Sequence, residues 1–223
     1  MSNVLVQDAF LLLLLVGFSI QLGHYIDRVM SGHRVFLSRV ISPLESGIYR
    51  LMGIPSDEEM SARKYALSAL LFSLIGLIIV FLLMLLQGRL LNPEGLPGTS
   101  WHLAFNTAAS FVSNTNWQAY SGETTLSYLT QMLGLMVQNF VSAATGIAVL
   151  YALIRGFVRR ERNTIGSFWV DLTRITLYVL LPLSLIVALV LVSQGVVQSL
   201  GAYHSIQTLE SGRTPARRSV VRK

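Results

Sequence analysis

Four long apolar stretches constrain the fold of this chain more than any other feature of its sequence. A helix needs about 20 consecutive apolar residues to cross the hydrocarbon core of a lipid bilayer. Only 13% of the 223 residues are charged, whereas soluble domains carry about 25% charged residues. The sequence therefore predicts an all-α membrane protein with about four transmembrane helices. We place them at about 6–27, 64–87, 124–154 and 169–198.

The first apolar stretch has one feature of a secretory signal peptide, because "AFLLLLLVGFSI" at 9–20 has the length of an apolar signal core. However, no Lys or Arg precedes it and no small-residue cleavage site follows it. The first basic residue is Arg28, which comes after the stretch. We therefore interpret residues 1–27 as a retained N-terminal transmembrane helix.

Lys and Arg residues are distributed unevenly among the connections between these stretches. Residues 28–64 hold six of them and residues 155–174 hold five, whereas residues 88–123 hold only Arg89. Connections rich in Lys and Arg stay on the cytoplasmic side of a membrane. This pattern predicts that the N-terminus lies outside the cell.

Three local signals refine this outline. "PLESGIYRLMG" at 43–53 predicts a short amphipathic helix in the first connection. Ser56, followed by Glu59 three residues later, is typical of a capping box, so we expect Ser56 to cap the helix of the second stretch. Pro182 lies inside the fourth stretch and should kink it. Membrane helices tolerate such a proline where a neighbouring group binds the freed carbonyl.

A segment between the second and third stretches, residues 100–112, is too short to span. Thr99 or Ser100 can cap a helix there, and its apolar residues recur every three or four positions. Thirteen helical residues rise about 20 Å, less than the roughly 30 Å hydrocarbon core. The segment is either an interfacial helix followed by a polar loop, or a re-entrant pore helix followed by a selectivity filter.

The polar segment that follows, "SNTNWQAYSGE" at 113–123, is uncharged until its last residue and rich in amides and hydroxyls. A pore helix would direct the partial negative charge of its C-terminal carbonyls at this segment. Rings of backbone carbonyls can replace the hydration shell of a potassium ion. Asn, Thr and Gln add oxygen ligands without a fixed charge. The pore-helix interpretation therefore favours a monovalent cation.

The third stretch carries a polar face, because its polar residues are spaced by seven, four and three positions. They are Gln131, Gln138, Ser142 and Thr145. Gly134, Ala143 and Gly146 would let other helices approach closely. Hydrogen bonding between helices and contact with an ion both explain this face, and in either case the helix faces protein rather than lipid.

Two longer strings are distinctive. They are "NTAASFVSNTNWQAYSGETTLSYLTQMLGLMVQNFVSAATGIAVLYALIRGF" at 106–157 and "GSFWVDLTRITLYVLLPLSLIVAL" at 166–189. Together with the weaker "ISPLESGIYRLMGI" and "GLPGTSWHLAFN", they resemble the potassium-binding A subunit of the bacterial Kdp-type potassium-importing ATPase. The resemblance runs from the N-terminal helix to about Tyr203, with faint traces to residue 210.

The resemblance implies a fold of four non-identical helix–pore-helix–helix repeats around one filter, preceded by an extra helix. It implies that the first quadrant of a potassium filter is formed by Ser113, Asn114, Thr115, Asn116 and Gln118. Asn114 and Thr115 would provide backbone carbonyls, and Asn116 and Gln118 would shape and contact the ion site. Trp117 would pack behind the filter.

The same resemblance divides the chain into six segments. They are an N-terminal transmembrane helix at 1–27, a cytoplasmic loop at 28–63, the first repeat at 64–154 with its pore helix at 100–112 and filter at 113–118, a cytoplasmic loop at 155–168, the first helix of the second repeat at 169–198, and a divergent basic tail at 199–223.

The resemblance also implies function and partners. The chain would bind and translocate potassium, the transported ligand, in an ATP-driven import complex of the bacterial cytoplasmic (inner) membrane. ATP hydrolysis would belong to a separate P-type ATPase subunit. Small accessory membrane subunits and membrane lipid would be further partners, and no nucleic acid is expected to bind. The chain lacks a G-x-x-x-x-G-K-[ST] phosphate-binding motif, so we expect it to be non-catalytic. Asp27, Asp171 and Arg174 would form loop-anchoring ion pairs.

Other functions stay open. Family members are far longer, and one filter segment supplies only a quarter of a ring, so the chain could be a truncated, non-functional copy. It could instead be a small homo-oligomeric cation channel, although the TVGYG string of potassium channels is absent. A membrane scaffold or assembly subunit without an ion path is a third option. An enzyme fits worst, because cysteine is absent and His24, His33, His102 and His204 lack metal-ligand spacing.

Overall fold

The computed structural model describes residues 2–159, 163–196, 204–206 and 219–221. Within these residues, four helices are long and apolar enough to cross a membrane. They are Val4–Met30, Ala62–Arg89, Thr130–Val158 and Phe168–Ser193. The prediction of an all-α membrane protein with about four spans is confirmed.

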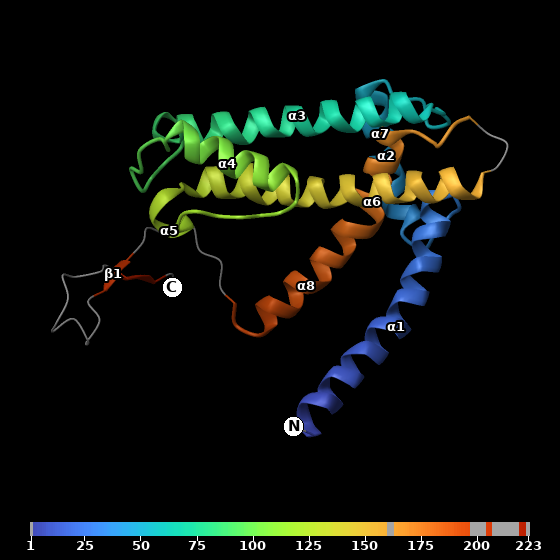
Figure 1. Cartoon of the computed structure of the whole chain (residues 1–223), viewed down its shortest axis with the longest axis horizontal. Coiled ribbons are helices and arrows are strands. Elements are labelled where there is room, and N and C mark those ends of the chain that lie inside the picture. Colours follow the sequence, from blue (N-terminus) through green and yellow to red (C-terminus); the bar gives the residue numbers. More distant parts are fainter. Residues whose placement is uncertain (1, 160–162, 197–203, 207–218, 222–223) are drawn as a thin grey trace.

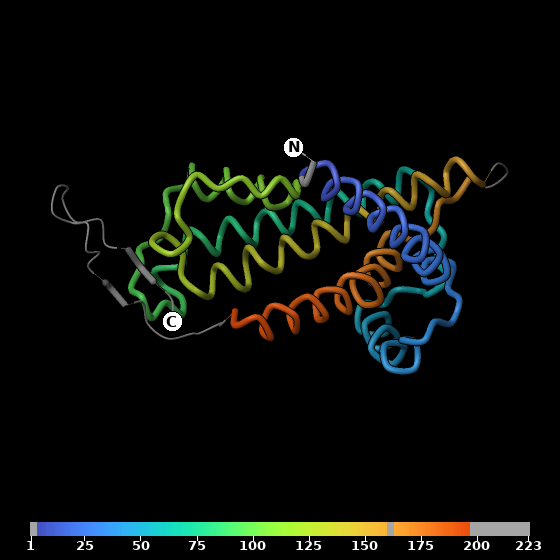
Figure 2. The backbone as a smooth tube through the Cα atoms, turned by 90° about the horizontal axis from the view of Figure 1, so that it is seen from below, coloured from blue at the N-terminus to red at the C-terminus, as the bar shows by residue number. Residues whose placement is uncertain are grey.

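The second and third spans lie side by side and run in opposite directions (Figures 1 and 2). The second span is α3 (Ala62–Leu86), which continues into a 3-10 turn, η1 (Gln87–Arg89). The third begins with a π-helical segment, η2 (Thr130–Met136), and continues as α6 (Val137–Val158). A short helix, α4 (Trp101–Val112), packs against both α3 and α6.

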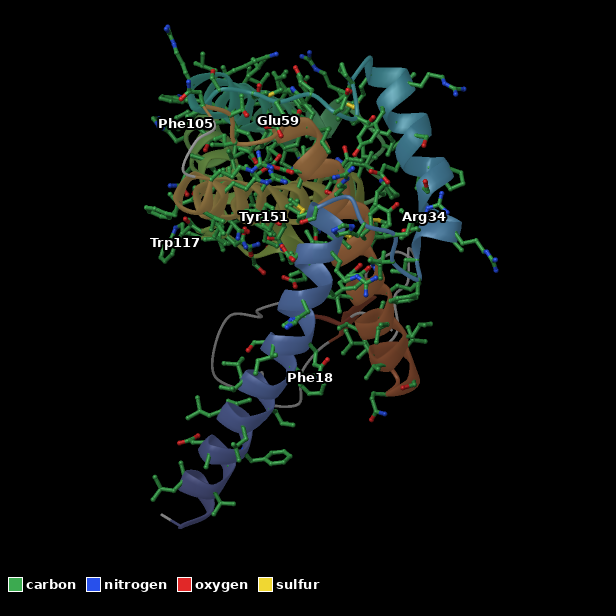
Figure 3. The ribbon with its side chains drawn as sticks, turned by 90° about the vertical axis from the view of Figure 1, so that its right-hand side faces the viewer. Phe18, Arg34, Glu59, Phe105, Trp117 and Tyr151 are labelled. Carbon is green, nitrogen blue, oxygen red and sulfur yellow. The ribbon has the colours of Figure 1, made fainter. Side chains whose placement is uncertain are left out.

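The first and fourth spans extend obliquely away from the α3–α6 pair (Figure 1). The first is α1 (Ser2–Met30), and the fourth consists of α7 (Phe168–Arg174), π-helical η3 (Ile175–Leu180) and α8 (Leu181–Ser193). Apolar side chains such as Phe18 project from α1 into open space (Figure 3). An apolar surface of this extent is stable only against lipid or other apolar protein surface.

Pro182 lies in the fourth span, and a neighbouring helix bonds the carbonyl that it leaves without a donor, as the sequence predicts for membrane helices; the kink itself stays a prediction. It follows the π-helical η3, at the start of α8. Because Pro182 has no N–H, the carbonyl of Tyr178, four residues earlier, loses its usual helical donor. The hydroxyl of Tyr25 on α1 donates a hydrogen bond of 2.9 Å to that carbonyl. A neighbouring helix therefore satisfies the freed acceptor.

The predicted amphipathic helix of the first connection is α2 (Ser38–Met52), which ends at Gly53 in the left-handed conformation. The prediction for Ser56 is wrong. The second span begins later, at Ala62, and its cap is Ser61, whose hydroxyl accepts a hydrogen bond from the Lys64 N–H. Ser61 lies at the position from which a hydroxyl reaches the N3 amide, whereas Ser56 lies in a turn.

Glu59 therefore has a different role from that of a capping-box acid. Its carboxylate accepts hydrogen bonds from the Arg159 guanidinium at 3.1 Å and from the Gly166 N–H at 2.9 Å. Burial raises the pKa of this carboxyl, but hydrogen bonds from Thr164, Arg159 and Gly166 outweigh burial and hold the pKa below its ordinary value. Glu59 thereby links the first connection, between the first and second spans, to the connection between the third and fourth spans.

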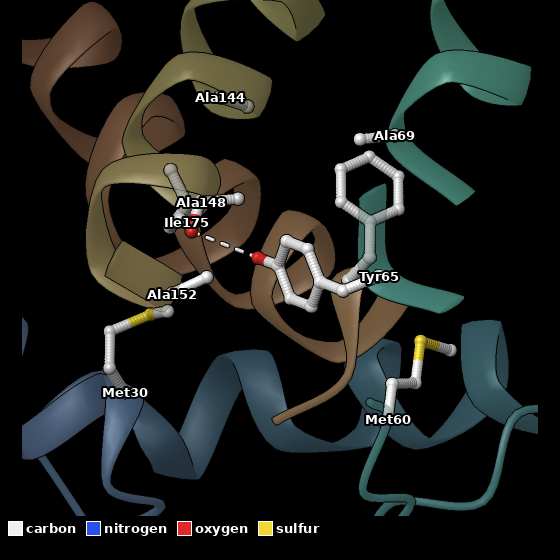
Figure 4. Packing of buried hydrophobic residues seen from close by; sticks show 9 residues of the cluster. Met30, Met60, Tyr65, Ala69, Ala144, Ala148, Ala152 and Ile175 are labelled. Carbon is white, nitrogen blue, oxygen red and sulfur yellow. Dashed lines mark hydrogen bonds between the residues drawn. The ribbon is translucent and has the colours of Figure 1, made fainter. Parts of the chain in front are cut away.

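The ends of the four spans meet at what we call the loop end, where Met30, Met60, Tyr65, Ala152 and Phe168 are buried together. Figure 4 shows Met30, Met60 and Tyr65 converging there from different segments. The Tyr65 hydroxyl donates to the Ala148 carbonyl at 2.9 Å. Burial of these apolar side chains fixes how the spans are joined.

A buried ion pair crosses the loop end. Arg155 of α6 contacts Asp171 of α7 at 2.5 Å, and the two side chains are 12% and 1% exposed. Arg174 pairs with Glu45 of α2 at 3.1 Å. The expected anchoring role is confirmed for Asp171 and Arg174, whereas Asp27 accepts a hydrogen bond from the Tyr151 hydroxyl at 3.1 Å.

The third span starts later than predicted. The sequence placed its start at 124, but a short helix, α5 (Gly122–Thr125), is followed by a break before η2. Gln87 explains the break, because its fully buried amide donates to the carbonyls of Pro97 and Thr125 at 2.7 Å each. Its carbonyl oxygen accepts the Ser127 N–H at 3.2 Å. This one side chain satisfies main-chain groups that a longer helix would have paired internally.

The described part of the tail forms two short strands. β1 (His204–Ile206) pairs antiparallel with β2 (Ser219–Val221), with Ser205 opposite Val220. The rest of the tail predicted at 199–223 lies outside the described residues.

Candidate functional site

The short helix α4 begins beside the end of α3. The N–H and the hydroxyl of Thr99 both donate to the Met84 carbonyl, at 3.1 and 3.3 Å. Ser100 then caps α4 by accepting the Leu103 N–H. These contacts fix the point and direction from which α4 extends back along α3.

α4 lies close to its neighbours because its buried face consists mainly of small residues, with Phe111 as the large exception. Ala104 and Ala108 are fully buried, and Thr107 between them is also fully buried. Val80 and Met84 of α3 belong to the same apolar cluster. Small side chains let two helix backbones approach closely where no water separates them. The larger Trp101 and Phe105 point outward and are exposed.

The chain reverses direction directly after α4, through two asparagines in the left-handed backbone region. Asn114 has φ 58° and Asn116 has φ 57°. Few residues other than Gly adopt this backbone region at low cost, and Asn is one of these few. After this reversal the segment runs back along α4 to α5 (Figure 1).

Four consecutive N–H groups of the reversed segment point at the C-terminal end of α4. Those of Thr115 and Asn116 donate to the Ser110 carbonyl at 3.0 and 3.2 Å, and that of Asn114 donates to Phe111. The Trp117 N–H donates to the Ser110 hydroxyl at 2.5 Å. In a planar trans peptide the C=O points opposite to the N–H. The carbonyls of residues 113–116 are therefore directed away from α4.

The side chains of both asparagines are held by α6. The Asn116 amide donates to Asn139 Oδ1 at 2.8 Å. The Ser142 hydroxyl donates to Asn114 Oδ1 at 3.2 Å. Ser113 and Thr115 share a hydrogen bond between their hydroxyls at 3.0 Å. The backbone geometry of the segment is thus fixed from α4 and its side chains are fixed from α6.

The segment lies at the middle of the spans rather than at their ends. Asn139 and Ser142 are close to the centre of the span Thr130–Val158, and α4 ends partway along α3 and α6 (Figure 1). Residues 113–119 are nevertheless exposed. Uncovered polar backbone is not tolerated against the hydrocarbon of a bilayer. This face therefore meets water or further protein.

Sequence comparison shows which family has these features. The sequence model of the potassium-transporting ATPase A subunit (KdpA) matches residues 9–221. The chain belongs to this family. The match continues past Tyr203, where the sequence had led us to expect the resemblance to fade, and it includes the residues of both strands.

Curated relatives carry a consistent name. Proteins called potassium-transporting ATPase potassium-binding subunit are 61% identical over 213 residues in Listeria monocytogenes serotype 4b and 56% identical over 211 residues in Clostridium botulinum strain Eklund 17B. These alignments cover 95% and 94% of this chain, but only 38% and 36% of the relatives. The chain thus spans just over a third of the length of each relative.

The structure brings together four of the five residues that the sequence analysis proposed for the filter. Ser113, Asn114, Thr115 and Asn116 make up the reversal, and Gln118 follows on the same exposed segment. Trp117 does not pack behind the segment. Its side chain is 63% exposed and lies at the edge of the helical bundle (Figure 3). The left-handed Asn116 turns the chain so that the next side chain faces outward.

The polar face predicted on the third span is only partly continuous. Ser142 contacts the reversed segment, and Gln138 is buried against Gly76 of α3, where a Cβ atom would collide with the Gln138 amide. Gln131 instead holds the break by donating to the carbonyls of Gly122 and Leu126. Thr145 bonds within its own helix, to the Val141 carbonyl.

Small residues on this span behave differently from one another. Gly134 lies close to Leu83 of α3, as expected for a position of close helix approach, whereas Gly146 faces open space.

Sequence reasoning missed Ser110 and Asn139, the two residues that hold the reversal. The N-x-x-S spacing of Asn139 and Ser142 was visible, but nothing in the sequence links it to a segment more than 20 positions away.

Proposed function

We propose that residues 113–118 form one quadrant of a potassium filter in an ATP-driven potassium-importing complex. One observation carries this proposal: the N–H groups of 114–117 point into the end of α4, which turns the carbonyls of residues 113–116 toward the exposed side. A dehydrated potassium ion needs such carbonyl oxygens in place of its water. The names of the curated relatives support the choice of potassium.

Electrostatics favour a monovalent cation at this position. The C-terminal end of α4 carries about half a negative charge from the aligned peptide dipoles of the helix. The segment itself has amides and hydroxyls but no carboxylate between Ser113 and Ser121. Dipoles of this kind stabilise a single positive charge while still allowing it to leave. In this proposal Asn114 and Thr115 provide carbonyls, and Asn116 and Gln118 shape the site.

The exposed face of the segment supports a quadrant rather than a whole filter. Polar residues at half-depth need protein or water on their open side. Further repeats of a full-length family member would close the ring, and the chain spans 38% of its Listeria relative. A separate P-type ATPase subunit would hydrolyse ATP, and small accessory membrane subunits would complete the complex. In this proposal the loop end lies in the cytoplasm and the N-terminus lies outside, and the basic connections at 28–64 and 155–174 support that orientation.

A chimera tests the proposal. The matched N-terminal part of the Listeria relative is replaced by this chain, and the chimera is expressed in a bacterium that lacks its own A subunit. We expect growth at limiting potassium. Gln118→Arg should abolish that growth, because a fixed positive charge in the quadrant repels the ion.

The matched control is Gln194→Arg, which places the same change at the exposed end of α8. It should leave growth intact. Equal growth of the Gln118→Arg and unsubstituted chimeras would refute the filter assignment. The amount of each chimera in the membrane, measured by immunoblot, separates loss of transport from loss of protein.

A further inference from the structure

A basic cavity lies beside α2, far from the candidate filter. Its volume is about 770 Å³, and it is an open cavity lined by the end of α1, the turn at 31–37, α2 and the fourth span. The described lining includes the basic residues Arg34, Arg39 and Arg174 and the acidic residue Glu45. The cavity opens at the loop end, where the spans meet.

The acidic residue of this cavity is already fully engaged. The Glu45 carboxylate accepts the Arg174 Nε at 3.1 Å, and the hydroxyls of Tyr49 and Tyr178 at 2.8 and 2.7 Å. Burial, followed by the nearby Glu45 charge, raises the pKa of Tyr49, so that hydroxyl stays protonated and remains a donor. Glu45 and Arg174 therefore balance each other in charge.

The remaining basic residues leave the cavity with an excess of positive charge. Arg34 and Arg39 form no salt bridge with any carboxylate in the part of the chain that the structure describes. Both are exposed, and Figure 3 shows Arg34 near α2. Two unpaired guanidinium groups at the mouth of one cavity suit an anionic, phosphate-like group, which Arg recognises through paired N–H donors.

The outer face of α2 is apolar. Val40, Leu44 and Leu51 are 76%, 53% and 88% exposed, and their spacing of four and seven places them on one side of the helix. Ile41 and Tyr49 on the other side are buried. α2 packs against η3 of the fourth span, and its axis runs across the direction of α3 and α6 (Figure 3). A helix with this pattern and orientation lies in the membrane interface.

We propose that the cavity binds the head group of an anionic phospholipid, with the phosphate between Arg34 and Arg39. Phe36, which also lines the cavity and is 81% exposed, contacts the glycerol and upper acyl region of the same lipid. A soluble anion would use the guanidinium groups but would gain nothing from an exposed phenyl ring between them. The apolar face of α2 keeps the cavity mouth at head-group depth.

Lipid titration tests this site without any measurement of potassium, so its failure is distinguishable from failure of the filter proposal. The full chain in an uncharged detergent is titrated with short-chain phosphatidylglycerol and with phosphatidylcholine of equal chain length. Native mass spectrometry measures binding. We expect a clear preference for phosphatidylglycerol, and Arg34→Gln with Arg39→Gln should reduce it by about 25-fold, about fivefold for each arginine.

The control removes two charges outside the cavity, by Arg50→Gln with Arg63→Gln. It should change the preference by less than about threefold, because isolated surface charges in a detergent micelle do not bind a single head group specifically. Equal losses in both double variants would overturn the proposal in favour of diffuse attraction. Displacement of the lipid by an equal concentration of inorganic phosphate would overturn it in favour of a free-anion site.

Discussion

Asn114 and Asn116 determine the backbone path of the candidate filter. Each adopts the left-handed region, and each is also held by α6 through its side chain. The sequence showed a dense set of amides, and from their chemistry we predicted the polar segment and its oxygen ligands. It could not show that two of these residues turn the backbone and bind α6. The turn depends on hydrogen bonds to α4, and the side-chain partners lie on a helix that begins about 20 residues later.

Replacing Asn116 tests this double role. Asn116→Val should lower the free energy of unfolding by about 1–2 kcal/mol for the left-handed backbone, plus about 1 kcal/mol for the lost hydrogen bond to Asn139. Asn116→Gly keeps the backbone conformation and should cost only the hydrogen bond. Thermal unfolding in detergent, followed by circular dichroism, measures both. Equal destabilisation by Val and Gly would contradict the backbone argument.

The buried pair of Arg155 and Asp171 gives a second test at the same scale. Arg155→Met leaves the Asp171 carboxylate, which is 1% exposed, without its partner, and removal of one partner of a buried pair costs about 3–5 kcal/mol. The double variant Arg155→Met with Asp171→Leu should recover most of this loss. Unfolding by denaturant measures the three free energies. A double variant as unstable as Arg155→Met would show that other Arg155 bonds, such as that to the Met30 carbonyl, dominate.

At the scale of elements, the length of each apolar run predicted the four spans well. In a membrane, a single apolar run can pair all its backbone N–H and C=O groups internally only as a helix. Boundaries were less predictable. The third span begins at Thr130 rather than 124 because Gln87, 40 residues away, binds the main chain of the break. The cap of α3 was missed because Glu59, three residues after Ser56, is typical of a capping box. Glu59 instead bonds to Arg159 and Gly166, and Ser61, which is paired with Thr164, caps the helix.

Glu59 gives a pH-dependent prediction for the join between these elements. Its pKa is lowered in the folded state, so the stability it contributes is present above its unfolded pKa of about 4.5 and is lost as the pH falls through the folded value. The midpoint of thermal unfolding should therefore drop as the pH falls below about 4.5. Glu59→Gln should flatten this dependence, and Asp57→Asn, at an exposed position in the same loop, should not. Identical pH profiles for both variants would contradict the assignment.

At the scale of the whole molecule, the most important feature is the exposed face of the candidate filter. Residues 113–119 face open space, and the chain spans 38% of the length of its Listeria relative. The sequence predicted one filter segment out of four, and that prediction came from its resemblance to a family rather than from periodicity. No pattern within the chain could have shown the number of repeats needed to close a ring.

The chain expressed by itself should not restore growth at limiting potassium to a strain that lacks its A subunit. One quadrant offers a potassium ion carbonyls on a single side, which is too few to replace its hydration shell. Growth yield against external potassium concentration measures this, with the chimera as the positive control. Robust growth with the isolated chain would show that copies of it assemble a complete pore.

The hydrogen bonds between the reversed segment and α4 have a consequence for biosynthesis. The described hydrogen-bond partners that shape residues 113–117 lie between Ala109 and Ser142. A ribosome needs to have synthesised only as far as α6 before this loop can take its final form in the membrane. Later parts of a full-length relative would then meet a finished surface, so closure of the proposed filter would be a docking step between preshaped pieces.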